Sequence, residues 1–259
     1  MNFTDMHAQS TPLLIANVWD VTSAKAAQHA GFTAMGTSSA AIADMYGYAD
    51  GDGEGLSFQE LHYLVKRLRA CCSLPLTVDM EYGYAKSTEE IVGNVLALAE
   101  LGVVGINLED SLGQHVQRTL RDATEFARLL RDCRQQLDQN NCPLFINART
   151  DTFLLGLENA REETLARGML YATHGADGLF VPCITQQGDI SAVVDTVPLP
   201  LNVMCMPALP DFSTLTSLGV KRISMGNFIH QHCQASSQRL FSSILASQSS
   251  KAVFAHADE

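Results

Sequence analysis

The sequence lacks an excess of basic residues, a signal-like start and any apolar run long enough to cross a membrane. Its 259 residues include 17 Lys and Arg against 28 Asp and Glu, so the formal net charge is −11. Nucleic acids and anionic membranes are bound through basic surfaces that displace counterions, and we therefore expect neither as a partner. The first five residues carry no basic group and no apolar run of the kind found in signal peptides. These absences predict a soluble, cytoplasmic protein.

A disulfide framework is lacking as well. The seven cysteines are odd in number and irregularly spaced, and Cys71 is followed directly by Cys72, so reduced thiols are the better interpretation. No low-complexity, linker-like or repeated segment divides the chain. Its 46% hydrophobic and 17% charged residues are typical of a globular protein with a sizeable core. We expect one domain over residues 1–246, followed by a polar tail over residues 247–259.

Short apolar runs that alternate with helical patterns are the main feature that is present. Eight such runs, bounded by turn residues, are candidate strands: 13–17, 33–37, 76–79, 105–108, 144–147, 178–181, 201–204 and 222–225. In the stretches between them, apolar residues return at intervals of three and four, as in residues 89–99. Ser87 is expected to cap that helix, and Gly102 to end it.

Strict alternation of strand and helix predicts parallel strands with right-handed crossovers. Eight such units close into a barrel, so we predict an α/β protein with a (β/α)₈ or TIM barrel in a single domain. An open, doubly wound sheet is the alternative. It is disfavoured because no glycine fingerprint follows the first strand, which ends in Asn17-Val18-Trp19-Asp20.

Acidic residues stand at the ends of three consecutive candidate strands, where such barrels carry their chemistry. Asp79 and Glu81 stand at the end of the third strand, Glu109 at the fourth and Asp151 at the fifth. Unpaired acids this close together would repel one another, so a cation is implied. Oxygen ligands without a His or Cys pair favour Mg²⁺, or else Mn²⁺, over zinc. The alternative is that these acids cap strand ends or form ion pairs with Arg149 and the region of Arg118.

A run of small residues over 36–41 follows the second strand and contains Thr37, Ser38 and Ser39. Small side chains let backbone amides approach a ligand, which suits a carboxylate or a phosphonate. An ordinary turn with hydroxyl caps is the alternative. The next segment, residues 46–55, is rich in Gly and Asp but lacks the spacing of a calcium loop, and we interpret it as a mobile lid.

Through these motifs the chain resembles the isocitrate lyase and phosphoenolpyruvate mutase superfamily over nearly its whole length. The family segments Asp-x-Asp-x-Gly-Tyr-Gly, Leu-Glu-Asp and Ala-Arg-Thr-Asp correspond to residues 79–85, 108–110 and 148–151. The resemblance implies Mg²⁺ at Asp79, Glu81 and Glu109. It also implies a substrate carboxylate on the amides around Ser38 and Ser39, bound by Arg149 from the far side, and a lid acid at Asp50. A 2-oxo acid can chelate such a metal, which then stabilises the enolate left by bond cleavage.

The loop after the fourth strand departs from the lyases of this superfamily. They carry Lys-x-Cys-Gly-His there, whereas residues 111–118 read Ser-Leu-Gly-Gln-His-Val-Gln-Arg. The missing cysteine disfavours an isocitrate or methylisocitrate lyase. His115 is the nearest residue able to transfer protons, although a solvated surface histidine is the alternative. Asn202, together with Met-x-x-Pro at 204–207, looks like members that decarboxylate oxaloacetate or have no settled substrate, and Pro182 stands where mutases have a histidine.

The sequence therefore predicts a Mg²⁺-dependent lyase, decarboxylase or hydrolase that acts next to a 2-oxo carboxylate through an enolate. An oxaloacetate-like or phosphonopyruvate-like 2-oxo acid, or a 2-hydroxy acid, is the expected substrate. A pyruvate-type metal-dependent aldolase and a catalytically inactive ligand-binding barrel are the alternatives. The candidate catalytic residues are Asp50, Arg149 and His115, and the candidate substrate-binding residues are Thr37, Ser38, Ser39, Arg149 and Asn202.

The last helical pattern, over residues 227–246, carries apolar residues that need a partner surface. In the resembled superfamily this helix packs against a neighbouring subunit or exchanges with it. A homo-oligomer, dimer or tetramer, is expected on that basis. The alternative is that the helix closes its own barrel, because an eight-stranded barrel also needs an eighth helix.

Overall fold

Eight parallel strands form a closed barrel in the computed structural model, which describes residues 2–49, 55–114 and 117–254. Going round the barrel, the strands are β1 (Leu13–Val18), β2 (Met35–Thr37), β3 (Leu76–Asp79), β4 (Gly105–Glu109), β7 (Phe145–Arg149), β8 (Gly178–Val181), β9 (Leu201–Met204) and β10 (Arg222–Ser224), which pairs with β1. The predicted (β/α)₈ barrel is confirmed, and each strand lies within two residues of its predicted bounds.

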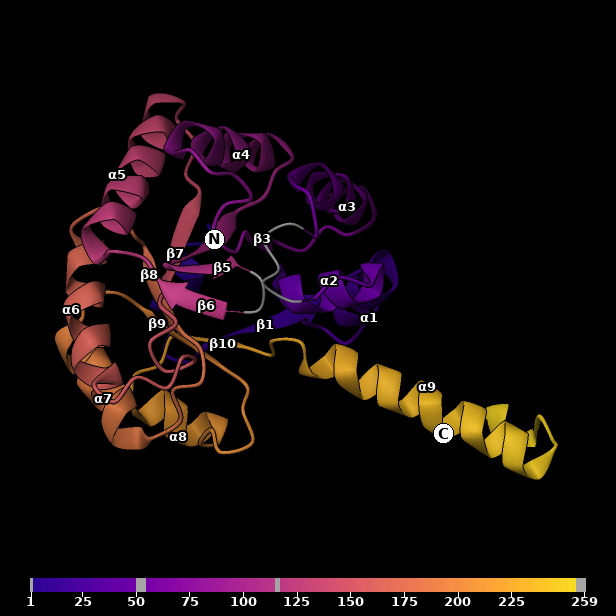
Figure 1. The fold of residues 1–259 in the computed structure, drawn as a ribbon. Coiled ribbons are helices and arrows are strands. Elements are labelled where there is room, and N and C mark those ends of the chain that lie inside the picture. Colours follow the sequence, from indigo (N-terminus) through magenta and orange to yellow (C-terminus); the bar gives the residue numbers. More distant parts are fainter. Residues whose placement is uncertain (1, 50–54, 115–116, 255–259) are drawn as a thin grey trace.

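Helices surround the barrel in an outer layer (Figure 1). They are α1 (Val21–His29), α2 (Ser39–Tyr46), α3 (Phe58–Cys71), α4 (Thr88–Glu100), α5 (Ala123–Gln139), α6 (Ala160–Ala172), α7 (Gln187–Thr196) and α8 (Phe212–Ser217). The 3₁₀ helices η1 (Asp5–Ala8) and η2 (Lys251–Val253) lie near the two ends of the chain. The last helix, α9 (Phe228–Ser247), projects away from the barrel in Figure 1.

Local signals explain why α4 forms where the sequence predicts it. The Ser87 hydroxyl accepts a hydrogen bond from the backbone N–H of Glu90 over 3.2 Å, and the Glu90 carboxylate accepts one from the backbone N–H of Ser87. This capping box satisfies amides that the first turn leaves without partners. Gly102, with φ at 77°, then turns the chain out of the helix. Between these signals, Ile91 and Leu98 are buried against the barrel.

The two ends of the barrel differ in character. At the N-terminal end of the strands, Phe3 and His7 close the barrel: the ring of His7 stacks on that of Phe145 with centroids 4.2 Å apart. Higher in the barrel the interior is polar, because Asn147 donates hydrogen bonds to the side-chain oxygens of Asn107 and Asn202 over 2.9 and 3.0 Å. The barrel interior is therefore closed at the N-terminal end of the strands by a plug of Phe3, His7 and Phe145, and it is lined by polar side chains towards the C-terminal end.

Two features differ from a plain succession of strands and helices. Residues after β4 form an antiparallel hairpin, β5 (Ser111–Gln114) and β6 (Gln117–Leu120), where the sequence analysis described only a loop. At the start of α9, His230 lies against the ring of Trp19 and forms a hydrogen bond with Asp44 of α2 over 2.8 Å. The helix thus leaves the barrel from a fixed contact with α2.

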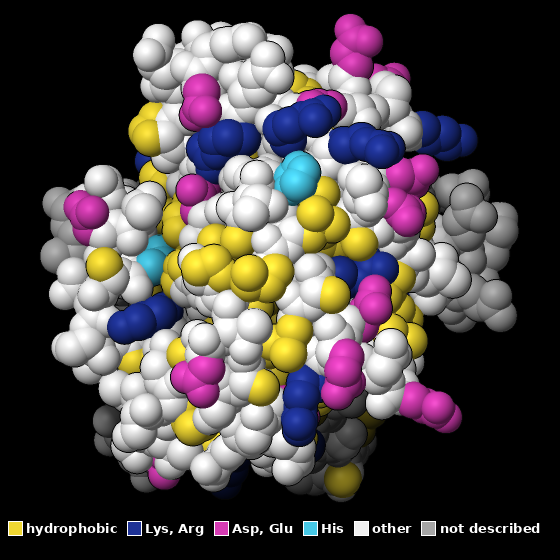
Figure 2. All heavy atoms as spheres, turned by 90° about the vertical axis from the view of Figure 1, so that its left-hand side faces the viewer, with side chains coloured by type: hydrophobic (Ala, Val, Ile, Leu, Met, Phe, Trp, Pro, Cys, Tyr) yellow, Lys and Arg dark blue, Asp and Glu magenta, His cyan; other side chains and the backbone are white. Residues whose placement is uncertain are grey.

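The outer face made by α5, α6 and α7 is mixed in character (Figure 2). Basic side chains line its upper part, apolar side chains fill much of its middle, and acidic side chains are spread among them. Within the described residues, no helix is both long enough and apolar enough to span a membrane.

Candidate active site

Asp79 is held at the carboxyl end of β3 by the end of β2. The Thr37 hydroxyl accepts a hydrogen bond from the backbone N–H of Asp79 over 2.8 Å, and the Ser39 hydroxyl donates one to Asp79 Oδ2 over 3.0 Å. The Asp79 side chain is buried. Its carboxylate is therefore fixed in one orientation inside the mouth of the barrel, as a ligand or a substrate-binding group requires.

Glu81 stands in a strained turn directly after β3. Three residues of this turn have positive φ: Glu81 at 46°, Gly83 at 107° and Tyr84 at 56°. For residues other than glycine, such a backbone costs about 1–3 kcal/mol and persists where the surroundings enforce it, which is common at functional sites. Here the backbone N–H of Glu109 donates to the Glu81 carbonyl over 2.8 Å and holds the turn against β4.

Arg149 is the centre of a buried charge network at the end of β7. Its Nε lies 2.7 Å from Asp151 Oδ1, and its Nη1 lies 2.9 Å from Glu109 Oε2 and 3.9 Å from Asp79 Oδ2. Burial raises the pKa of Glu109 to about 8, although the charge of Arg149 opposes the rise. Burial also disfavours ionisation of Asp151, but Arg149 outweighs it, so the pKa of Asp151 is lowered. Arg149 and Asp151 thus form the firm ion pair, and Glu109 is the acid that is easily neutralised.

The β5–β6 hairpin is anchored onto this network. Arg118 of β6 places Nη1 3.2 Å from Glu109 Oε1 and 2.9 Å from Asp151 Oδ2. The Ser111 hydroxyl at the start of β5 also contacts both carboxylates, at 3.0 and 2.5 Å. The hairpin is therefore tied to the acids at the pocket mouth rather than lying free above them.

A second buried network lies behind the first. Asp110 Oδ2 accepts hydrogen bonds from the Tyr171 hydroxyl over 2.7 Å and from Arg167 Nη1 over 3.0 Å, and Asp110 Oδ1 accepts one from the backbone N–H of Asp151 over 3.2 Å. All these groups are buried. They join α6 to the ends of β4 and β7, so they position Glu109 and Arg149 without reaching the pocket.

A cavity of about 180 Å³ opens between the carboxyl ends of the strands. Five of the predicted site residues line it: Thr37, Ser38, Ser39, Asp79 and Arg149. Further lining residues come from the barrel interior and the loops, among them Asn17, Thr77, Asn107, Phe180, Arg222 and Ser224. The structure therefore brings the predicted carboxylate-binding turn and one predicted metal ligand to the same small space.

The small-residue turn is the start of a helix. Ser38 is the N-cap of α2, with its hydroxyl accepting from the backbone N–H of Ala41 over 3.3 Å, and Ser39 is the first helical residue. Helix N-termini expose backbone amides and carry partial positive charge, so they bind anionic groups. The turn can therefore take a carboxylate, as the sequence suggested, although its geometry is that of a helix end.

Other predicted residues lie elsewhere. Asn202 is buried beneath the cavity, where it bonds to Asn147 and Ser224, and it is not among the residues that line the space. Glu81 and Glu109 are also absent from that lining. Asp50 and His115 lie outside the described residues, so their roles stay predictions.

The donors at the strand ends suit a hard divalent cation. Among the described residues, no group of three or more His, Cys, Asp or Glu side chains is arranged to hold a metal ion. Mg²⁺, however, keeps several of its waters and needs only one or two direct carboxylate ligands. Asp79 as the direct ligand, with Glu81 and Glu109 bonding to the water shell, fits the oxygen-only donor set. The raised pKa of Glu109 agrees with a place where added positive charge is favourable.

Several residues of the site were not selected as candidate site residues from the sequence. Asp151 belongs to the Ala-Arg-Thr-Asp segment and could have been selected with Arg149, because the two lie two residues apart after the same strand. Arg118 was expected only as an ion-pair partner of the strand-end acids, and it pairs with Glu109 and Asp151. Ser111 carries no such signal, since its contacts depend on the hairpin. Arg222 begins the three-residue strand β10, Arg-Ile-Ser, and its burial is not marked by the sequence, because arginine is usually exposed.

Comparison of the sequence with known families and proteins gives long matches. Residues 3–245 match the family described as phosphoenolpyruvate phosphomutase. An uncharacterized protein of Mycobacterium tuberculosis is 32% identical, over 88% of this chain and 82% of that protein. The 2-methylisocitrate lyase of Salmonella typhimurium is 29% identical, over 80% of this chain and 70% of the lyase. The oxaloacetate decarboxylase of Pseudomonas fluorescens is 28% identical, over 87% of this chain and 77% of that enzyme.

The fold has a similar match among solved structures. A crystal structure of a candidate phosphonomutase from Burkholderia cenocepacia superposes with a TM-score of 0.87 at 34% sequence identity. The match covers 93% of this chain and 97% of that chain. The similarity to this structure, in sequence and in fold, therefore extends over almost the whole chain.

Proposed function

The chain belongs to the phosphoenolpyruvate phosphomutase family, and on that premise we propose that it is a Mg²⁺-dependent lyase acting next to a 2-oxo carboxylate. Within that class, decarboxylation of an oxaloacetate-like 2-oxo dicarboxylate fits the site best. The observation that carries the proposal is the fixed Asp79 carboxylate in one 180 Å³ cavity with Arg149 and the start of α2.

The choice of decarboxylation over retro-aldol cleavage follows from the absence of the lyase cysteine. Residues 111–118 carry no cysteine of the Lys-x-Cys-Gly-His type. A retro-aldol lyase needs a base to take the hydroxyl proton of its substrate. Loss of CO₂ from a 2-oxo acid carrying a carboxylate on carbon 3 requires no such proton transfer before the bond breaks. The oxaloacetate decarboxylase of Pseudomonas fluorescens, at 28% identity, supports this choice.

The residues of this chain then have separate tasks. The amides at the start of α2, around Ser38 and Ser39, and the Arg149 guanidinium bind the carboxylate beside the keto group. Asp79, Glu81 and Glu109 hold the divalent cation, which when bound polarises the keto oxygen and disperses the negative charge that bond cleavage leaves. Asp151 keeps the guanidinium of Arg149 oriented through its 2.7 Å contact.

The closing of the site over the substrate is assigned to the hairpin. Arg118 links β6 to Glu109 and Asp151, so a hairpin in this position covers the acids and limits the entry of water. Exclusion of water strengthens electrostatic interactions within a site. Asp50 and His115 stay proposed as a lid acid and a proton donor from the flanking segments.

An assay of oxaloacetate consumption tests the proposal. Turnover is followed with Mg²⁺ and with excess EDTA, and the non-enzymatic reaction is subtracted from each. We expect activity that depends on Mg²⁺ and that falls at least about 1,000-fold in Asp79→Ala. Calorimetry on the same variant should show the loss of Mg²⁺ binding, with smaller losses in Glu81→Ala and Glu109→Ala.

The alternatives give different results in the same experiment. Turnover of 2-methylisocitrate, 2,3-dimethylmalate or phosphonopyruvate but not oxaloacetate would replace the decarboxylase by another member of the lyase class. Condensation of pyruvate with an aldehyde would indicate an aldolase. Tight binding of oxalate without turnover of any of these compounds would indicate a binding protein.

A further inference from the structure

Arg222 places its guanidinium inside the barrel below the strand-end acids. It stands at the start of β10, and its Nη2 donates to Asn107 Oδ1 over 3.3 Å on β4, the strand opposite β10 in the barrel order. The side chain is only 2% exposed, and Nε and Nη1 have no hydrogen-bond partner among the described residues. Buried polar groups are nearly always satisfied in folded proteins. Two unused donors on one buried charge therefore need an explanation.

The titratable groups around Arg222 do not neutralise it. Burial lowers the pKa of Arg222 to about 9, against the charge of Asp79, which favours the ionised form. The guanidinium therefore remains charged at neutral pH. His7, in the plug at the other end of the barrel, has its pKa lowered to about 4 by burial and by Arg222, so it is uncharged. Within the described chain, Asp79 is the acid that acts on Arg222, and Asp79 is assigned to the metal.

Thr77 supplies a further unused group in the same place. Its hydroxyl is buried and has no partner among the described residues. Thr77 and Arg222 line the cavity together with Asp79 and Arg149. The volume of about 180 Å³ corresponds to about six water molecules, so a ligand that fills it has to be small.

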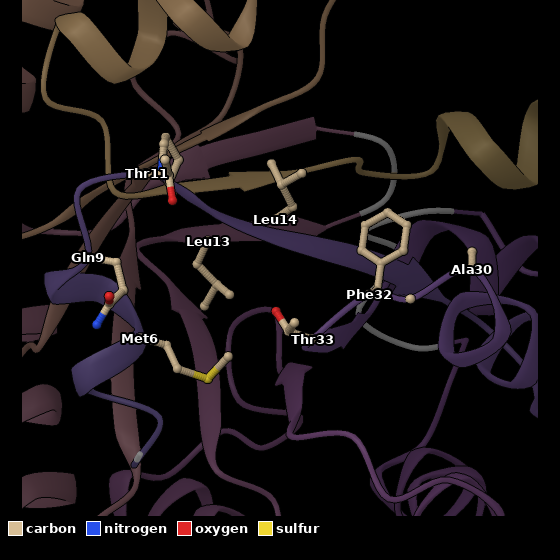
Figure 3. A pocket seen from close by; sticks show the side chains of 10 residues that line it. Met6, Gln9, Thr11, Leu13, Leu14, Ala30, Phe32 and Thr33 are labelled. Carbon is tan, nitrogen blue, oxygen red and sulfur yellow. The ribbon is translucent and has the colours of Figure 1, made fainter.

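A larger cavity near the first strand lacks this character. The cavity of about 480 Å³ at the N-terminal end of β1 is larger, but no ionisable side chain lines it in the described structure (Figure 3). Figure 3 shows apolar side chains, such as Met6, Leu13 and Phe32, around it. The N-terminal end of these barrels serves stability rather than chemistry.

We propose that Arg222 and Thr77 form a second anion subsite at the floor of the barrel cavity, which takes the second acidic group of a dicarboxylate ligand. The first acidic group lies between the start of α2 and Arg149, so the inference rests on the proposed function and narrows its substrate class. A carboxylate at the floor accepts hydrogen bonds from the free donors of Arg222 and from the Thr77 hydroxyl. A monocarboxylate of the same length leaves these donors unused.

Calorimetric titration with a matched pair of ligands tests the subsite without any turnover. L-malate and L-2-hydroxybutyrate have the same four-carbon chain and differ at the far end, where one has a carboxylate and the other a methyl group. In the presence of Mg²⁺, the wild-type protein should bind malate about 10- to 100-fold more tightly, the range expected for hydrogen bonds to a charged group. Equal affinity, or no binding of malate, would overturn the subsite.

Variants test whether Arg222 and Thr77 cause the preference for malate over 2-hydroxybutyrate. Arg222→Met should reduce the malate preference to about one, Thr77→Val should reduce it several-fold, and Arg222→Lys should retain part of it. Arg131→Met, the same change on the exposed face of α5, is the control and should keep the full preference. A full preference in Arg222→Met would overturn the assignment, and the Thr77→Val result stands even where Arg222→Met fails to fold.

Two further readouts separate this inference from a structural role and from the proposed function. Removing a buried, uncompensated charge should leave the melting temperature of ligand-free Arg222→Met equal to that of wild type or higher, whereas a structural role predicts a lower one. The malate preference does not depend on chemistry. A protein that shows it but turns over no 2-oxo acid retains the subsite and loses the proposed function.

Discussion

The charged side chains at the carboxyl ends of the strands lie at the end of the barrel where the sequence places them. Which of them form ion pairs with one another does not follow from the sequence. Asp79, Glu109 and Arg149 were selected because each follows a strand, and all three lie at the same end of the barrel. The contacts of Arg149 with Asp151 and of Arg118 with Glu109 depend on side-chain placement across loops. The sequence indicates that these acids can pair with Arg149 and with the region of Arg118, but which side chains meet is decided only in the folded chain.

Arg149→Lys separates charge from shape at the centre of the site. Lysine keeps the positive charge but loses the planar fork that contacts Asp151 through Nε and Glu109 through Nη1. We expect kcat/KM to fall about 100-fold in steady-state kinetics, because the substrate carboxylate is no longer bound in a fixed orientation. Arg131→Lys on exposed α5 is the matched control. Near-normal kinetics in Arg149→Lys would make Arg149 a simple point charge.

His7 should make the stability of the protein sensitive to acid. Burial, with a contribution from Arg222, lowers its pKa from 6.5 to about 4. Between pH 6.5 and pH 4 the unfolded chain therefore binds more protons at His7 than the folded chain does. The free energy of unfolding is highest above pH 6.5, and the part that depends on His7 is lost as the pH falls towards 4. The loss attributable to His7 is on the order of 3 kcal/mol. In His7→Phe, which keeps a ring to stack on Phe145, chemical denaturation at pH 7 and pH 4.5 should show a smaller difference than in wild type. An unchanged difference would mean that another group is responsible.

At the scale of elements, helices and barrel strands were predictable and the hairpin was not. Strands with continuous apolar runs, such as β1 and β8, carry their signal in the sequence, and Ser87 and Gly102 mark the ends of α4. In residues 111–120, apolar residues do not alternate with polar ones, so no strand period is visible. The hairpin contacts the barrel through Ser111 and Arg118 instead. Tertiary contacts, which a local pattern does not contain, hold it in place.

The hairpin should change its dynamics when the site is filled. Ser111 of β5 and Arg118 of β6 both contact Glu109, which is proposed to bind the water shell of the metal. Binding of metal and ligand therefore changes the contacts that hold the two strands. We expect the described amides of the two strands to exchange hydrogen about tenfold more slowly with Mg²⁺ and oxalate than without them. Arg118→Ala should remove most of this protection, while β9, on the other side of the barrel, serves as the internal control. Equal exchange with and without ligand would identify the hairpin as a fixed part of the scaffold.

For the whole molecule, the most conspicuous feature is α9, which projects from the barrel with apolar side chains uncovered. Phe241 and Leu245, one helical turn apart, are 66% and 71% exposed. Only His230 is buried among the residues of this helix. The alternative, that α9 closes its own barrel, does not describe this arrangement, whereas the predicted subunit partner would supply a surface that covers the helix.

Light scattering at micromolar concentration tests the assembly. We expect a mass that is a multiple of the 28.1 kDa chain, as for the dimer or tetramer predicted from the resemblance. Phe241→Asp should shift the mass towards the monomer, because a charge in an apolar interface is costly. Ser243→Asp, on the opposite side of α9, should leave the mass unchanged. A wild-type mass of 28.1 kDa would reject the oligomer.

Helix α2 has two ends with different contacts, and this has a consequence for regulation. Its first turn contributes Ser38 and Ser39 to the cavity, whereas Asp44 near its other end binds His230 of α9. In an assembly built on α9, a shift of this helix acts on the element that receives the substrate carboxylate. Association and ligand binding are then linked in both directions. If dilution of the protein weakens its binding of carboxylates, saturation with a carboxylate should strengthen its self-association, and the reverse.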